Sequence, residues 1–194
     1  IGGGEGAHFG HWSSAGDIDA DIILSAESGD VALTAQSAGN VRAGHVGANN
    51  NGQIVLSGAG VKLEANGSGN AIAGHQGSGT QQGAIILHAE DGDIVLDDGA
   101  MGGMWRVGHG TASNNVTNAP VILVSNTVNG GALNLDADFT NRLIQQNIGG
   151  GDVTLGSGPI TVDVPIVYAS NNELNLLSRG DLTVSELIRN NGSG

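Results

Sequence analysis

Four histidines, each preceded by a glycine, carry the clearest chemical signal in the chain. Gly-His occurs at residues 10–11, 44–45, 74–75 and 108–109, so that successive copies are 34, 30 and 34 residues apart. If the copies stack in adjacent turns of a repeat, their imidazoles lie about 4.8 Å apart. We predict a structural ladder of neutral, hydrogen-bonded rings formed by His11, His45, His75 and His109.

Metal binding is the alternative role for these histidines. Imidazole is a good ligand for zinc and copper. A straight column of rings, however, does not provide the tetrahedral arrangement that zinc prefers, so we expect no metal at this column. In either role the histidines are expected to make the fold sensitive to acid, because protonation places like charges side by side.

Two groups of acidic residues are candidates for calcium binding. The first consists of Asp17, Asp19 and Asp21, and the second of Asp91 and Asp93, with Glu90, Asp97 and Asp98 nearby. Neither group matches a complete EF-hand loop, which has Gly at its sixth position and Glu at its twelfth. We expect solvated turn carboxylates and no cofactor, with calcium as the alternative.

The sequence offers no catalytic constellation. Polysaccharide hydrolases and lyases place an acid and a base in a cleft, or a calcium ion beside Arg or Lys. Here the six basic residues fall in different repeats, and aromatic residues make up only 3% of the chain. Arg179-Gly-Asp181 has the form of an integrin-binding tripeptide, but Gly-Asp recurs as a turn before strands. We predict no catalytic residue and no enzyme activity, with a carbohydrate-active enzyme as an alternative.

Composition predicts many short strands and excludes some partners. The chain has 35 Gly and 3 Pro, and its Val, Ile, Leu and Ala residues form short runs between Gly, Asn, Asp and Ser. No helical periodicity is evident. The net charge of −13 disfavours nucleic acid and anionic membrane as partners. No apolar run approaches the length of a membrane span, so we expect no membrane insertion.

The Gly-His motif belongs to a longer repeat that predicts the fold class. Residues 41–45, 71–75 and 105–109 share one frame, and two further strand-like runs separate consecutive copies, such as 53–56 and 61–63. Three short strands per repeat of about 30 residues describe one triangular coil of a parallel β-helix. We therefore predict an all-β solenoid of about six three-stranded coils.

Three columns of inward-facing residues are expected from this repeat, each residue stacking on its equivalent in the next coil. The first column consists of Leu24, Leu56, Leu87, Leu123, Leu155 and Leu176. The second consists of Leu33, Leu63, Leu96, Leu135, Val162 and Val184. The third consists of Phe9, Ala43, Ala73, Val107, Ile144, Ile166 and Ile188.

The length of the repeat changes along the chain. Steps of the third column are 30 to 37 residues up to Ile144 and 22 residues after it. We interpret residues 1–194 as one solenoid segment, with longer, loop-bearing coils over 1–118 and shorter coils over 119–194. The extra residues are assigned to loops at 47–53, 77–83 and 110–119, where insertions in repeat proteins commonly serve recognition.

The chain resembles one known family. Gly-Asp-Val-Thr-Leu at 151–155, Gly-Asp-Leu-Thr-Val at 180–184, the segment 171–184 and the Arg-(Ala/Val)-Gly-His motif resemble repeat regions of filamentous-haemagglutinin-like exoproteins. The resemblance implies a right-handed β-helix forming the shaft of a large secreted adhesin or fibre at a bacterial cell surface, exported by two-partner secretion. The Asn-Pro-Asn-Gly-type signature of that family's secretion domain does not occur in these residues.

The two ends of such a solenoid present unpaired strand edges, which natural solenoids cap or continue. No capping segment is apparent, so we expect either a longer parent chain or units that stack end to end. The expected function is a structural shaft of an extracellular adhesin or fibre, and the alternative is a self-assembling filament or sheath. The expected partners are neighbouring coils or subunits and surface glycans or proteins, with nucleic acid excluded.

Overall fold

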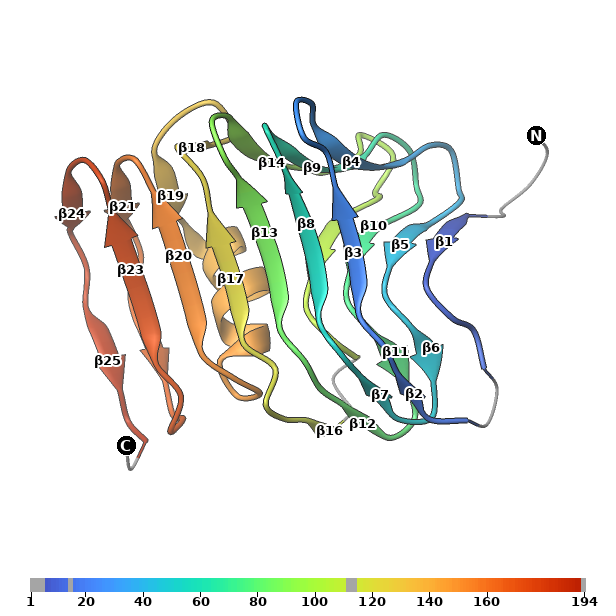
Figure 1. Cartoon of the computed structure of the whole chain (residues 1–194). Coiled ribbons are helices and arrows are strands. Elements are labelled where there is room, and N and C mark those ends of the chain that lie inside the picture. The colour runs from blue at the N-terminus through green and yellow to red at the C-terminus, as the bar shows by residue number, and fades with distance from the viewer. Residues whose placement is uncertain (1–5, 14–15, 111–114, 193–194) are drawn as a thin grey trace.

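The chain winds into a parallel β-solenoid in the computed structural model, which describes residues 6–13, 16–110 and 115–192 (Figure 1). Its longest sheet has six strands, and each strand pairs in parallel with its equivalent in the neighbouring coil. These strands are β3 (Ile22–Ser25), β8 (Ile54–Gly58), β13 (Ile85–Ala89), β17 (Val121–Val124), β20 (Val153–Ser157) and β23 (Leu174–Ser178). The predicted all-β solenoid is confirmed.

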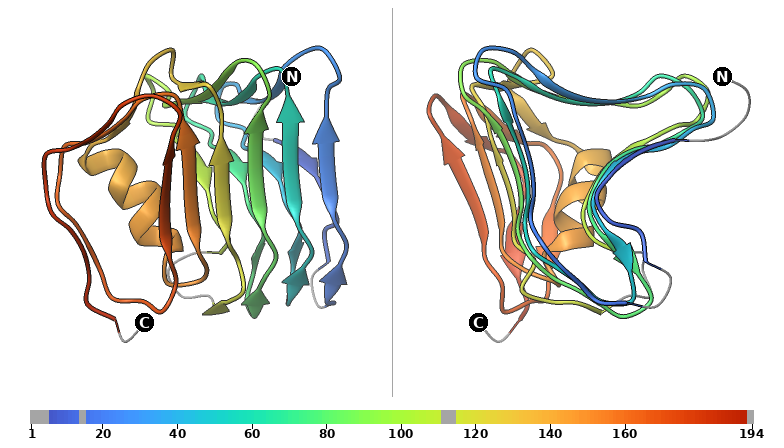
Figure 2. Two further views of the ribbon diagram at one scale, coloured as in Figure 1. Left: turned by 60° about the vertical axis from the view of Figure 1, so that its left-hand side comes forward. Right: turned by 45° about the vertical axis from the view of Figure 1, so that its right-hand side comes forward.

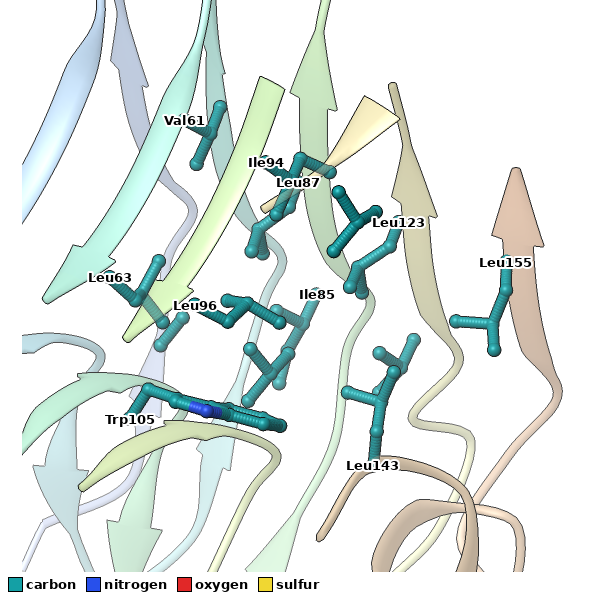
Figure 3. Close-up of a cluster of buried hydrophobic side chains, with 14 of the residues drawn as sticks. Val61, Leu63, Ile85, Leu87, Ile94, Leu96, Trp105, Leu123, Leu143 and Leu155 are labelled. Atoms are coloured by element: carbon teal, nitrogen blue, oxygen red, sulfur yellow. The ribbon is translucent and has the colours of Figure 1, made fainter. Parts of the chain in front are cut away.

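A column of leucines runs through this six-stranded sheet. The register pairs Leu24 with Leu56, and then Leu87, Leu123, Leu155 and Leu176 follow in order. The first predicted column is therefore confirmed at every step. Figure 3 shows Leu87, Leu123 and Leu155 packed side by side in the interior. Stacked residues of equal size bury apolar surface continuously along the axis, and this burial stabilises the solenoid.

The second face is divided into two sheets. Strands β4 (Val31–Ala35), β9 (Val61–Ala65), β14 (Asp93–Asp97) and β18 (Thr127–Val128) form one sheet, in which Leu33, Leu63 and Leu96 are paired. Strands β19 (Leu133–Leu135), β21 (Ile160–Val162) and β24 (Leu182–Val184) form the other, in which Leu135, Val162 and Val184 are paired.

The predicted step from Leu96 to Leu135 is wrong. Strand β18 ends at Val128, and a turn through Asn129 and Gly130, both at positive φ, leads the chain away from β14. The Asn129 side chain meets the Leu96 backbone instead: Oδ1 accepts from the Leu96 N–H at 2.8 Å, and Nδ2 donates to the Leu96 carbonyl at 3.3 Å. The amide of Asn129 thus makes the two backbone hydrogen bonds to Leu96 that a further strand would have made.

The third face begins with a four-stranded sheet. Strands β1 (Ala7–Phe9), β5 (Val41–Ala43), β10 (Ala71–Ala73) and β15 (Trp105–Val107) pair in parallel and align Phe9, Ala43, Ala73 and Val107, as predicted. Near the C-terminus, β22 (Ile166–Tyr168) pairs with β25 (Ile188–Asn190) and aligns Ile166 with Ile188.

The prediction that Ile144 continues this column on a strand is wrong. Residues 137–147 are helical, beginning with α1 (Ala137–Phe139) and continuing as η1 (Thr140–Gln145). Asp136 caps the helix, because its Oδ1 accepts from the Phe139 N–H at 2.9 Å. Phe139, Leu143, Ile144 and Ile148 are buried at helical spacing. The expectation that helical periodicity is absent is therefore also wrong.

All three segments predicted to be loops contain paired strands. Strands β6 (Val46–Gly47) and β11 (Gln76–Gly77) pair with each other. A further sheet contains β2 (Ile18–Asp19), β7 (Asn50–Asn51), β12 (Thr80–Gln81) and β16 (Asn115–Val116). The coils before residue 100 therefore carry more than three strands each.

Viewed along the solenoid axis, the first coils have an L-shaped outline that bends inward along β5, β10 and β15 (Figure 2). This outline differs from the predicted triangle. The extra strands β2, β6, β7, β11, β12 and β16 lie at the lower end of the coils, opposite β4, β9 and β14 (Figure 1). The helix lies beside the inward bend, next to β15 (Figure 2).

Candidate functional site

The four histidines lie in one column inside the solenoid. The ring centroids of His45 and His75 are 4.9 Å apart with planes inclined by 8°, and those of His75 and His109 are 4.7 Å apart with planes inclined by 12°. His11 stacks on His45 at 5.4 Å and 23°. His45, His75 and His109 are buried, whereas His11 is exposed in the first coil.

Each ring nitrogen of the buried histidines has a hydrogen-bond partner. The backbone N–H of His45 donates to Nδ1 of His75 at 2.9 Å, and that of His75 donates to Nδ1 of His109 at 3.0 Å. The His11 N–H donates to Nδ1 of His45 at 3.0 Å. On the other side of the ring, Nε2 lies 2.8, 3.0 and 2.8 Å from three carbonyl oxygens, those of Ala20, Gly52 and Gly83.

These contacts determine the protonation state of the rings. A carbonyl oxygen can only accept, so each Nε2 carries a hydrogen, and each Nδ1 accepts from a backbone N–H and carries none. The buried histidines are therefore neutral Nε2–H tautomers. A proton added to Nδ1 would face the N–H that now donates to it.

Burial also favours the neutral form of these rings. Desolvation lowers the pKa of His75 to about 3 and that of His109 to about 4. It also lowers the pKa of His45, against a smaller opposing effect of the hydrogen bond to the Ala20 carbonyl. The three buried rings of the column are therefore uncharged at neutral pH, and they approach one another closely without repulsion.

The column has little capacity for a metal ion as it stands. A metal takes the lone pair of an imidazole nitrogen, and in His45, His75 and His109 that lone pair, on Nδ1, already accepts a backbone hydrogen bond. Among the described residues, no three His, Cys, Asp or Glu side chains converge in the manner of a metal site.

The glycine before each histidine has a steric reason. A Cβ at Gly44 would lie 2.0 Å from the Gly74 carbonyl oxygen, and one at Gly74 would lie 1.9 Å from the Gly108 carbonyl oxygen. The backbones of consecutive coils thus approach too closely here for any side chain. The Gly-His signal in the sequence combines this close approach with the stacked ring beside it.

The acidic candidates of the first group do not converge on one site in the described part of the chain. Asp17 accepts from Asn49 Nδ2 at 2.7 Å, and Asp21 accepts from the backbone N–H of Gln53 at 2.8 Å. The hydrogen bond from Gln53 lowers the pKa of the Asp21 carboxyl. Asp19 is exposed on β2.

The second acidic group behaves in the same way. Asp93 accepts from the Thr127 hydroxyl and from the Gly130 N–H, and these bonds hold the turn after β18. The Asp91 carbonyl accepts from Asn126 Nδ2 at 3.0 Å. Both residues therefore connect one coil to the next.

Two residues that sequence analysis missed close the edge of β15. In the preceding coils, the carbonyls of Phe9, Ala43 and Ala73 accept from the N–H groups of Gly44, Gly74 and Gly108. No strand follows β15 at this point. Asn147 Nδ2 donates to the Val107 carbonyl at 2.9 Å, and Arg142 Nη2 donates to the Trp105 carbonyl. The helix thus ends this sheet with two side chains.

Arg142 is held firmly in this position. Its guanidinium lies 3.8 Å from the centroid of the Trp105 ring, with Asp98 Oδ2 at 2.5 Å and Asp138 Oδ2 at 3.1 Å from Nη1. The Asp98 carboxylate also accepts from the Trp105 N–H at 3.0 Å. The sequence signal that could have revealed this helix is the capping residue Asp136, followed by apolar residues at helical spacing.

No protein-family model, curated protein or solved structure matches the chain. Within the described ranges, none of the helices has the length and apolar character needed to cross a bilayer.

Proposed function

We propose that the chain is a structural shaft segment of a secreted adhesin or extracellular fibre at a bacterial cell surface. The observation that supports this role is the uninterrupted six-stranded parallel sheet, with one leucine column along its whole length. A rod of stacked coils provides length and stiffness without large side chains. The net charge of −13 keeps such a surface soluble.

Two experiments test this proposal: one locates the protein on the cell, and the other measures how the purified segment resists force. Brief protease treatment of intact cells that make the protein should remove the epitope of an antibody against this segment, while a cytoplasmic marker remains. In single-molecule pulling, the purified segment should unfold in a series of separate force steps, because each coil contacts mainly its neighbours. Retention of the epitope inside intact cells would contradict the proposal.

Filament assembly is the second candidate, and the last coil supports it. Leu182 and Val184 pair with the buried Ile160 and Val162 of the preceding coil, yet they are 49% and 50% exposed. Among the described residues, no strand pairs with the outer edge of β24. A second copy could cover this surface and pair with β24. Sedimentation velocity and negative-stain microscopy of the intact protein at increasing concentration test this; a purely monomeric protein would rule it out.

A further inference from the structure

A groove follows the inward bend of the first coils, on the outer side of the four-stranded sheet. Strands β1, β5, β10 and β15 place their outward residues in register along it, namely His8, Arg42, Ile72 and Arg106. Two hollows of about 350 and 380 Å³ follow one another there. Arg42 lines the first and its register partner Ile72 lines the second, so the two hollows lie over neighbouring strands of one sheet, and together they are called the groove.

This groove concentrates positive charge in an acidic protein. The whole chain has six Lys and Arg residues against 19 Asp and Glu. Three of the six, Arg42, Arg106 and Arg142, line the two hollows. Arg142 is neutralised by Asp98 and Asp138. The other two have no carboxylate within ion-pair distance in the described part of the chain.

The two unpaired arginines are held by neutral groups. Arg42 donates to the Gly74 carbonyl and to Gln76 Oε1, both at 2.7 Å, and Arg106 donates to the His109 carbonyl at 3.2 Å. Burial lowers the pKa of Arg42 to about 10, and it lowers that of Arg106 in the same direction. Partly buried cations without a counter-ion are costly, and an anion in the groove would offset that cost.

The remaining lining matches a glycan better than a peptide. Trp12 lies beside the first hollow with 75% of its surface exposed, and Met104 beside the second with 52% exposed. The amides of Asn40 and Gln76 line the first hollow, and the amide of Gln146 lines the second. The strands cross the groove and pair with the coils on either side, so an extended peptide would find no free strand edge to join.

We propose that this groove binds a linear, carboxylate-bearing polysaccharide, such as a polyuronate, with its carboxylates on Arg42 and Arg106. The two arginines are two coils apart, about 10 Å along the axis, so carboxylates on separate sugars of one chain reach both. The exposed Trp12 ring offers a flat apolar face to a sugar at one end of the groove. The inference does not depend on the shaft role.

The test is titration calorimetry of the intact protein with oligogalacturonates of increasing length, and with neutral malto-oligosaccharides of the same lengths. Affinity for oligogalacturonate should increase with length and decrease with salt, whereas the neutral series should not bind. The Arg42→Gln/Arg106→Gln variant should lose about tenfold affinity per arginine. Arg179→Gln/Arg189→Gln is the matched control: it removes the same charge from exposed positions and should stay within about twofold of the parent.

Three results would overturn the proposal: no binding of oligogalacturonate, equal losses in both double variants, or tighter binding of poly-glutamate, which would indicate an acidic peptide as the occupant. Trp12→Ala keeps the test decisive if the groove variant melts at a lower temperature than the parent. Because Trp12 is largely exposed, this change should preserve the fold and weaken oligogalacturonate binding several-fold. Unchanged affinity would again contradict the inference.

Discussion

The backbone N–H of His75 donates to Nδ1 of His109, while the two imidazoles stack with their centroids 4.7 Å apart. One residue thus contacts its equivalent in the next coil through both its main chain and its ring. The same relationship joins His45 to His75. The hydrogen bonds that hold the coils in register therefore require the Nδ1 atoms of His75 and His109 to be unprotonated.

Acid should destabilise the fold through this column. The folded-state pKa values of His75 and His109, about 3 and about 4, lie below the unfolded value of about 6.5. The contribution of these two histidines to the free energy of unfolding is complete above about pH 6.5. It is lost as the pH falls below that value, because the unfolded chain then binds protons that the folded chain excludes. The loss should reach about 2 kcal/mol per histidine at pH 5.

Urea unfolding at pH 7.5 and pH 5 measures this effect. His75→Gln should reduce the pH dependence by about half of the combined contribution. His88→Gln removes a histidine outside the column, on the outer face of β13, and should leave the dependence intact. A free energy of unfolding that is the same at both pH values would contradict the prediction.

Removal of one ring should cost stability even at neutral pH. His75→Ala leaves the His45 N–H and the Gly52 carbonyl without their partners and opens a cavity between two rings. We expect a loss of about 2–4 kcal/mol in the free energy of unfolding at pH 7.5. His88→Ala, on the half-buried outer face, should cost less than about 1 kcal/mol; similar losses for both would argue against a structural column.

Closure of the β15 edge by the helix should depend on Asn147. Its Nδ2 donates to the Val107 carbonyl and also to the Leu143 carbonyl, at 2.9 and 2.7 Å. Asn147→Leu keeps the volume but removes both bonds at a buried position, so we expect a loss of about 1–3 kcal/mol in the free energy of unfolding. Asn134→Leu, at an exposed position of β19, is the control; an equal effect there would refute the capping role.

Substitution of the glycine before a histidine should be severe. The Cβ of Gly74→Ala would lie 1.9 Å from the backbone oxygen of Gly108. The coils must separate locally, and we expect a loss of at least about 3 kcal/mol or failure to fold. Gly29→Ala adds the same methyl group where no atom lies within 4 Å, and should cost less than about 1 kcal/mol. Thermal melting of the two variants distinguishes these outcomes.

The sequence alone predicted the fold class and the leucine column from Leu24 to Leu176. This succeeded because a solenoid places each coil on its neighbour, so that a repeat in sequence becomes a column in space. It also located the glycine and histidine positions of the column. These features follow from spacing along the chain, which the sequence displays directly.

Only the tertiary structure decided where a strand was replaced and which ring nitrogens carry hydrogen. Asn129 and Asn147 each take the place of a strand through one amide group, and a single polar side chain leaves no repeat to recognise. The neutral tautomer of His75 depends on His45 above it and on Gly52 across the coil. Arg42 and Arg106 occupy the same place in the Arg-(Ala/Val)-Gly-His motif, so the repeat already aligns them. Only the tertiary structure shows the hollows beside them and the neutral groups that hold them.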